Sequence, residues 1–200
     1  KIVPAVLLEC AEKSISNIVI ISAGFAEVGT DEGDALEEEV RKIAVEKKLN
    51  VIGPNCLGIL RPSHNMNASF AVHLPPEGSV ALISQSGAMA VGMMDSAQEV
   101  GLGFSLVASI GNTAVLNECD FLEIAAKDDD TKVIGLYLEN ITDGTRFLSA
   151  ASRITNPIVL LKSGVSTQGK EAAASHTGAL AGNDAAISAL CAQAGLHRAH

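Results

Sequence analysis

The sequence predicts an α/β protein built from doubly wound, mostly parallel sheets. Short runs of β-branched and other apolar residues alternate with segments of helical periodicity along the whole chain. Most of these runs are apolar at successive positions, which is typical of strands covered by helices on both faces. A hydrophobic content of 48% with 18% charged residues is enough to bury a core. The alternation therefore indicates helices layered around parallel sheets.

The predicted elements follow one another in a regular order. Strands are expected at 17–22, 50–53, 80–84, 103–109, 132–138 and 157–162. Helical periodicity predicts helices within 31–48, 87–101, 115–128 and 143–154, and a final helix that begins near Asp184. The first of these helices has acidic residues early and basic residues late, as the helix dipole favours.

Residues 61–79 interrupt this order. The segment carries Pro, Asn and Ser without periodicity and is long for a loop inside one domain. We interpret it as a connection between the later part of one doubly wound domain, residues 1–70, and a second domain, residues 77–200. The chain starts with neither a Met nor a signal peptide, so we expect a piece of a longer protein. We interpret "KDDD" at 127–130 as a solvated loop.

The composition excludes several classes of partner. The net charge is −9, from 14 basic and 23 acidic residues without a Lys/Arg cluster, so neither nucleic acid nor a membrane surface is an expected partner. No apolar run approaches the length of a membrane span. The four cysteines are far apart, which predicts neither a disulfide framework nor a metal site. We expect a cytoplasmic protein that binds small anions through local backbone donors.

The stretch "SQSGA" at 84–88 is a candidate anion site. A hydrolase nucleophile elbow needs Gly where Ser84 stands, so that interpretation fails. The predicted strand runs directly into a helix, so first-turn N–H groups and the hydroxyls of Ser84 and Ser86 converge at the positive end of the helix dipole. The alternative is an ordinary N-cap serine without a ligand.

Residues 163–182 contain two motifs that are candidates for binding or carrying phosphate. Residues 164–170 read G-x-x-x-x-G-K after a predicted strand, but Glu171 stands where a P-loop needs a hydroxyl. His176 lies among small residues, and neutral imidazole can attack phosphorus to form a phosphoramidate that passes the phosphoryl group onward. A surface histidine without function is the alternative.

A phosphohistidine needs a carboxylate that orients its ring. Glu139 follows the predicted strand 132–138, and ligands of parallel sheets bind at the carboxyl ends of the strands. Glu139 is therefore the candidate orienting residue, and a simple loop residue is the alternative.

Five blocks occur in the order of a known family: "GPNCLG" (53–58), "ALISQSGAMA" (81–90), "SIGN" (109–112), "YLEN" (137–140) and "SHTGALAG" (175–182). Through these blocks essentially all 200 residues resemble the NDP-forming acyl-CoA synthetases, relatives of the succinyl-CoA synthetase alpha subunit. The resemblance implies part of a Rossmann-like CoA-binding domain, followed by a flavodoxin-like domain with a doubly wound parallel sheet.

The resemblance also implies roles for individual residues. His176 is the phosphorylated histidine, and Glu139 supports its ring. The phosphate-binding segment, which faces the phosphohistidine, consists of Ser84, Ser86, Gly87 and Ala88. The candidates for the CoA-lining crevice are Ser22, Ala23, Gly24, Asn55 and Cys56.

The implied reaction interconverts acyl-CoA, NDP and phosphate with a carboxylic acid, CoA and NTP. The nucleotide, ADP/ATP or GDP/GTP with Mg²⁺, belongs to an ATP-grasp domain or beta subunit that this sequence lacks, and an oligomer is expected. Val91 stands where succinyl-CoA synthetases carry Tyr, which favours acetate or another small monocarboxylate as the acid. The glycines around His176 suggest that the segment 163–182 swings between two sites. We therefore interpret the apparent P-loop at 164–170 as the flexible stem of this segment.

Two rival functions remain. One is a non-catalytic CoA-binding or regulatory module, as in the synthetase-like regions of protein acetyltransferases, where the phosphorylated histidine is typically replaced. The presence of both His176 and Glu139 favours catalysis. The other is a redox Rossmann protein, which needs a G-x-G-x-x-G after a strand, and these 200 residues contain none.

Overall fold

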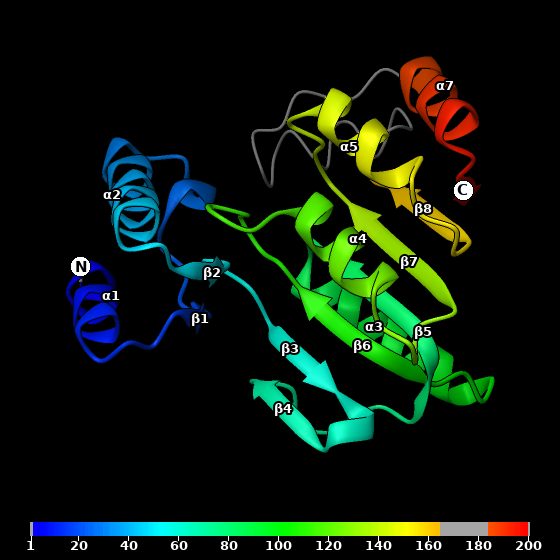
Figure 1. The fold of residues 1–200 in the computed structure, drawn as a ribbon, viewed down its shortest axis with the longest axis horizontal. Helices are drawn as coiled ribbons and strands as arrows, with labels where there is room; N and C mark the ends of the chain where they lie inside the picture. Colours follow the sequence, from blue (N-terminus) through cyan, green and yellow to red (C-terminus); the bar gives the residue numbers. More distant parts are fainter. Residues whose placement is uncertain (1, 165–183, 200) are drawn as a thin grey trace.

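The computed structural model describes residues 2–164 and 184–199. These residues form two sheets, a small one near the N-terminus and a large one that makes up the rest of the molecule (Figure 1). The N-terminal unit consists of α1 (Val3–Glu12), β1 (Asn17–Val19), the 3-10 helix η1 (Ala26–Val28), α2 (Asp31–Lys47) and β2 (Asn50–Ile52). Strands β1 and β2 pair in parallel.

The large sheet has the strand order β4-β3-β6-β5-β7-β8-β9. Its strands are β3 (Gly58–Arg61), β4 (Met66–Ser69), β5 (Glu77–Ser84), β6 (Phe104–Ser109), β7 (Val133–Leu138), β8 (Ile158–Lys162) and β9 (His197–Ala199). The strands β5 to β9 are parallel, and β3 and β4 form an antiparallel hairpin along β6. In chain order the parallel strands are arranged 2-1-3-4-5, which is the flavodoxin-like order.

Helices cover both faces of the large sheet. On one face α4 (Glu118–Ala126), α5 (Gly144–Ala151) and α7 (Asp184–Ala194) contribute to a core with Ile83 and Leu136. On the other face α3 (Gly87–Glu99) packs on Leu82 and Val107. Neighbouring residues of one strand, such as Leu82 and Ile83, thus enter opposite cores, as the alternation of strand side chains requires. The predicted α/β, doubly wound architecture is confirmed.

The six strands and five helices predicted from the sequence all occur, although several are shorter than expected. The α-helix α1, the strands β3, β4 and β9, and the two 3-10 helices of the described residues were not predicted. The segment 61–79 differs most from expectation, because it contains the end of β3, the 3-10 helix η2 (Pro62–His64), β4 and the start of β5. Its first part thus extends the large sheet instead of running as an irregular connection.

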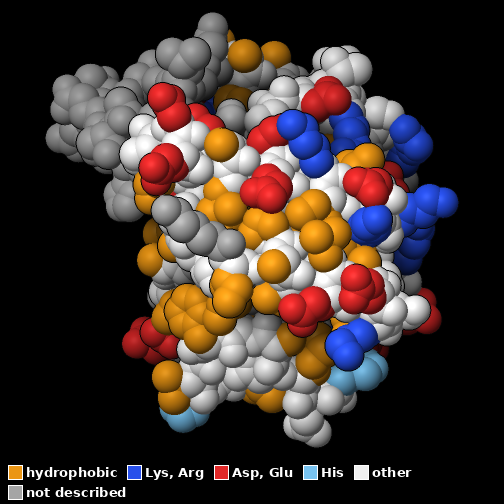
Figure 2. Space-filling view, turned by 90° about the vertical axis from the view of Figure 1, so that its left-hand side faces the viewer, with side chains coloured by type: hydrophobic (Ala, Val, Ile, Leu, Met, Phe, Trp, Pro, Cys, Tyr) orange, Lys and Arg blue, Asp and Glu red, His pale blue; other side chains and the backbone are white. Residues whose placement is uncertain are grey.

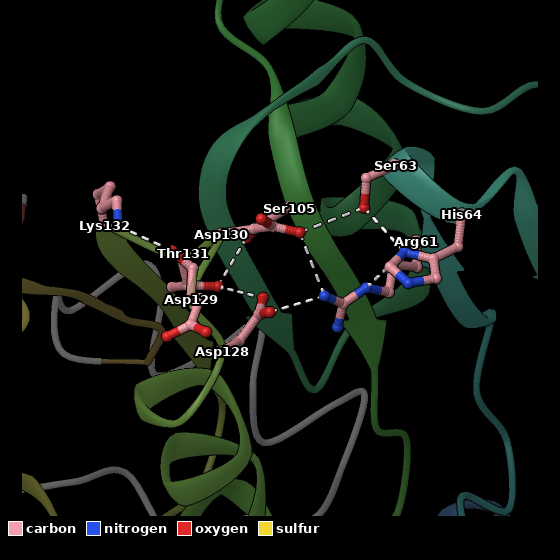
Figure 3. A network of polar contacts seen from close by, with 9 residues as sticks. All are labelled: Arg61, Ser63, His64, Ser105, Asp128, Asp129, Asp130, Thr131 and Lys132. Atoms are coloured by element: carbon pink, nitrogen blue, oxygen red, sulfur yellow. Dashed lines mark hydrogen bonds and ion pairs between the residues drawn. The ribbon is translucent and has the colours of Figure 1, made fainter.

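Arg61 holds this hairpin to the loop between α4 and β7 (Figure 3). Its guanidinium lies 2.6 Å from the carboxylate of Asp128 and 3.3 Å from that of Asp130. The Thr131 hydroxyl donates a second hydrogen bond to Asp128, at 2.8 Å. Residues 127–130 form a loop in which Lys127, Asp129 and Asp130 are exposed, as predicted, whereas the side chain of Asp128 is only 10% exposed. This ion pair with β3 could not be foreseen because β3 was not predicted.

The N-terminal unit has a small core and an apolar outer face. Its core includes Leu7 of α1, Val40 of α2 and Val51 of β2. Figure 2 views the side on which this unit lies and shows apolar side chains gathered over the middle of that face. The exposed apolar residues of α1 and the adjoining segments are Ile2, Val6, Leu8, Ile15 and Ile21. Within the described ranges, no helix has the length and hydropathy to cross a membrane.

Candidate functional site

The carboxyl ends of β5 and β7 lie side by side in the centre of the large sheet. Ser84 is paired with Tyr137, and the chain order of the parallel strands reverses between these two strands. Ligands of open α/β sheets bind at such a reversal point. A cavity of about 320 Å³ opens there, lined by Gln85, Glu139 and Asn140 from the strand ends, together with residues of the N-terminal unit. Glu139, the predicted orienting residue, therefore lines a cavity.

The turn between β5 and α3 leaves backbone donors free. The Ser84 hydroxyl is buried, with 0% of the residue exposed, and donates to the Ser86 carbonyl at 2.7 Å. Ser86 caps α3 by accepting a hydrogen bond from Met89 N–H at 3.3 Å. The N–H groups of Gly87 and Ala88 make no hydrogen bond to any residue in 2–164 or 184–199. Ser84 thus shapes the turn, whereas Gly87 and Ala88 are available to an anion at the positive end of the helix.

Glu139 is half-buried at the end of β7. Its backbone is held by the side chains of Gln85 and Lys162, which come from the two neighbouring strands. Neither residue was predicted as part of the site, although both stand at the carboxyl ends of predicted strands. His176, the proposed phosphate acceptor, lies outside the described residues.

Asn112 joins the N-terminal unit to the cavity. Its side-chain nitrogen donates to carboxylate oxygens of Glu27 at 2.6 Å and Glu37 at 2.7 Å, and its oxygen accepts from Asn55 at 3.2 Å. Burial alone would raise the pKa of Glu27, but the hydrogen bonds from Asn112 and from the backbone of Gly24 and neighbouring residues outweigh it and lower this pKa. The sequence contained a signal for this role, because Asn112 belongs to the "SIGN" block.

The predicted CoA-lining residues fall into two groups. Ser22, Ala23 and Gly24 are exposed beyond the carboxyl end of β1, and Gly24 lines a separate cavity of about 510 Å³ beside α2. Asn55 lines the central cavity. Cys56, by contrast, is only 3% exposed and donates its thiol hydrogen to the Ile20 carbonyl at 3.3 Å. Burial raises the pKa of this thiol to about 11, so Cys56 is a packed residue of low reactivity.

A largely apolar cavity lies along α3, beyond the turn between β5 and α3. It has a volume of about 340 Å³ and is lined in part by Leu57, Phe70, Val91 and Met94. Val91 is one helical turn beyond Gly87 on α3. In the part of the chain that the structure describes, no group of three or more His, Cys, Asp or Glu side chains is arranged to hold a metal ion.

Comparisons with known family models, proteins and structures agree on one family. The model of the succinyl-CoA ligase like flavodoxin domain matches residues 77–200. The ADP-forming acetate–CoA ligase of Methanocaldococcus jannaschii is 47% identical over 201 residues, which cover 100% of this chain and 28% of that protein. The alpha subunit of ADP-forming acetate–CoA ligase II of Pyrococcus furiosus is 42% identical over 198 residues, covering 98% of this chain and 43% of the subunit.

A solved structure has the same fold over nearly the whole chain. It is the dinucleotide-forming acetyl-coenzyme A synthetase 1 of Ca. Korarchaeum cryptofilum in complex with phosphate and ADP, with a TM-score of 0.92 and 37% identity. The match covers 99% of this chain and 43% of that one, so the chain spans less than half the length of these relatives. With its flavodoxin-like sheet and the family match over residues 77–200, the chain belongs to the NDP-forming acyl-CoA synthetases, through their succinyl-CoA ligase like flavodoxin domain.

Proposed function

We propose that this chain is the catalytic part of an NDP-forming acid–CoA ligase. Phosphate attacks the thioester carbonyl of an acyl-CoA and expels CoA, which leaves an acyl phosphate. A ring nitrogen of His176 then attacks the phosphorus and releases the carboxylate. NDP finally accepts the phosphoryl group and frees the histidine. All three steps are reversible, because each transfers a group between compounds of similar transfer potential.

One observation carries this proposal. Glu139 and the N–H groups of Gly87 and Ala88, which have no hydrogen-bond partner within residues 2–164 and 184–199, lie at the carboxyl ends of adjacent parallel strands, at the reversal point of the sheet. A phosphohistidine needs two features. One is a carboxylate that orients the imidazole ring, and the other is a set of backbone N–H donors that binds the phosphoryl oxygens. Fixed backbone donors stabilise anionic oxygens without reorganising during the reaction.

CoA and the acid have separate candidate sites. For CoA we propose the exposed segment Ser22–Gly24 together with Asn55, at the junction of the two sheets. The domain division of 1–70 and 77–200 remains part of this proposal. For the acid we propose the largely apolar cavity that Val91 lines, whose polar lining residues are His73, Asp95 and Gln98. Because Val91 itself supplies no polar group for a second carboxylate, we favour a small monocarboxylate such as acetate over succinate.

The nucleotide needs further protein. The relatives that the chain matches are longer, and one of them is named as an alpha subunit, which supports an ATP-grasp domain or beta subunit as partner and a larger assembly. The solved neighbour binds ADP, which favours ADP/ATP over GDP/GTP, and Mg²⁺ would accompany the nucleotide on that partner. Four free cysteines support a reducing, cytoplasmic setting.

The test is direct phosphorylation. The chain is combined with its nucleotide-binding partner or domain, ATP and Mg²⁺, and any acid-labile phosphate is mapped by mass spectrometry beside a His176→Ala variant. Label confined to His176 supports the ligase. If no label forms although the partner phosphorylates another alpha chain, the ligase is overturned, and a non-catalytic CoA-binding or regulatory module becomes the better account.

A further inference from the structure

The Glu139–Asn140 turn is held by side chains from both neighbouring strands. Gln85, the residue after β5, accepts hydrogen bonds through its side-chain oxygen from the N–H groups of Glu139 at 2.6 Å and Asn140 at 2.9 Å. Its side-chain nitrogen donates to the Asn140 carbonyl at 3.0 Å. One amide side chain thus satisfies three of the four backbone polar groups of this turn.

Lys162, the last residue of β8, satisfies the fourth group. Its ammonium donates to the Glu139 carbonyl at 2.6 Å and to the Ser163 carbonyl at 2.7 Å. The residue is only 7% exposed. Burial lowers the pKa of this ammonium, and the neighbouring Glu139 charge opposes that shift. Because a buried ammonium is costly unless it is bonded, these two contacts fix both the side chain and the turn.

The position of Gln85 couples this turn to the anion-binding turn. Gln85 stands between Ser84 and Ser86, and its own N–H donates to the Tyr137 carbonyl at 3.0 Å. A displacement of Glu139 relative to Gly87 and Ala88 would therefore break hydrogen bonds of Gln85. Misplacement of a catalytic group by about 1 Å can cost on the order of 100-fold in rate.

We propose that Gln85 and Lys162 are positioning residues, which act by holding Glu139 in register with the anion-binding turn. This inference rests on the proposed ligase function. Gln85 fixes the turn from β5, and Lys162 fixes it from β8. Neither residue contacts the substrate in this proposal, so each one affects the reaction rate only by fixing the position of Glu139.

The first measurement uses the complete enzyme, with its nucleotide-binding part, and radiolabelled ATP with Mg²⁺. Gln85→Met removes three hydrogen bonds at similar side-chain size, and Lys162→Met removes the ammonium. We expect each variant to slow the formation of acid-labile phosphate by roughly 10- to 100-fold. The ATP concentration for half-maximal rate should stay unchanged, because the nucleotide binds elsewhere.

Two control variants make the same types of substitution, Gln to Met and Lys to Met, at positions away from the site. Gln193→Met changes an exposed glutamine of α7. Lys132→Met removes an ammonium that also donates to a backbone carbonyl, that of Asp129, in the loop before β7. Both should keep the unmodified rate. Equal rates in Gln85→Met, Lys162→Met and these controls would overturn the proposal.

The decisive measurement repeats both substitutions in a Glu139→Gln background. If Gln85 and Lys162 act through Glu139, each causes less than about a twofold further loss there. Losses that multiply independently of Glu139 would overturn the positioning role, because a general structural defect acts in either background. Absence of label on the unmodified enzyme would instead overturn the ligase function itself, and the positioning role with it.

Discussion

The side-chain nitrogen of Asn112 lies 2.6 Å from a carboxylate oxygen of Glu27 and 2.7 Å from one of Glu37. A single amide group thus bridges two carboxylates of the N-terminal unit, and Glu37 is only 7% exposed. Because hydrogen bonds to charged groups are worth more than neutral ones, Asn112→Ala should lower the free energy of unfolding by about 2–4 kcal/mol.

Urea unfolding measures this loss. Asn50→Ala provides the control, since its side chain donates to Asn17 at an exposed position of the N-terminal unit. We expect that control to stay within about 0.5 kcal/mol of the unmodified protein. An Asn112→Ala variant as stable as the control would contradict the bridging role.

The same contacts predict a pH dependence. The pKa of Glu27 is lowered from its ordinary value of 4.5, so the folded state holds this proton less tightly than the unfolded state does. The resulting stabilisation is fully present above pH 4.5 and is lost as the pH falls below that value toward the folded pKa. Unfolding midpoints between neutral and acid pH should fall less steeply for Asn112→Ala. Parallel curves for the two proteins would refute the linkage.

The strands of the large sheet were predictable because they are apolar at successive positions. Strand β5 supplies Leu82 to one core and Ile83 to the other, and this double burial leaves an apolar run that is visible in the sequence. Strands β4 and β9, which read MNAS and HRA, lack such an apolar run, and β3 leads directly into the Pro- and Asn-containing segment 61–79. Their pairing depends on partners far away in the sequence.

The candidate site could be proposed from the sequence only where a single residue type suggests its own chemistry. Glu139 and the Ser86–Ala88 turn follow from their positions at strand ends. The roles of Gln85 and Lys162 depend on hydrogen bonds between neighbouring strands. The register of two paired strands cannot be determined from the sequence of either strand alone. Cys56 was grouped with the crevice because of its sequence neighbours, whereas its side chain points to the Ile20 carbonyl.

Two helix glycines should respond in opposite ways to substitution by Ala. A Cβ at Gly33 of α2 would lie 2.2 Å from the Phe25 carbonyl oxygen, so Gly33→Ala must displace backbone and should destabilise the protein by about 2 kcal/mol or more. Gly92 of α3 is exposed and an added methyl group there would have nothing within 4 Å, so Gly92→Ala should stabilise by about 0.5–1 kcal/mol. Thermal unfolding of both variants tests this, and equal shifts would contradict it.

The four cysteines should differ in reactivity. Cys56, Cys119 and Cys191 are buried, whereas Cys10 is partly exposed. Burial raises the thiol pKa to about 11 for Cys56 and about 12 for Cys119. In native protein at neutral pH, iodoacetamide should therefore modify Cys10 first, as peptide mass mapping over time would detect. Early modification of Cys56 would show that it is open to the crevice after all.

Strand β1 has a consequence for handling the 200-residue chain in solution. Within residues 2–164 and 184–199, β1 pairs only with β2, and α1, which precedes it in the chain, exposes Val6 and Leu8. Such an edge is a template for another strand, so we expect the isolated chain to self-associate as its concentration rises. Light scattering after size exclusion would measure this, with Val6→Lys on α1 reducing it and Val100→Lys, after α3, leaving it unchanged. Dilute samples in low-salt buffer are then the practical condition for studying the chain as a monomer.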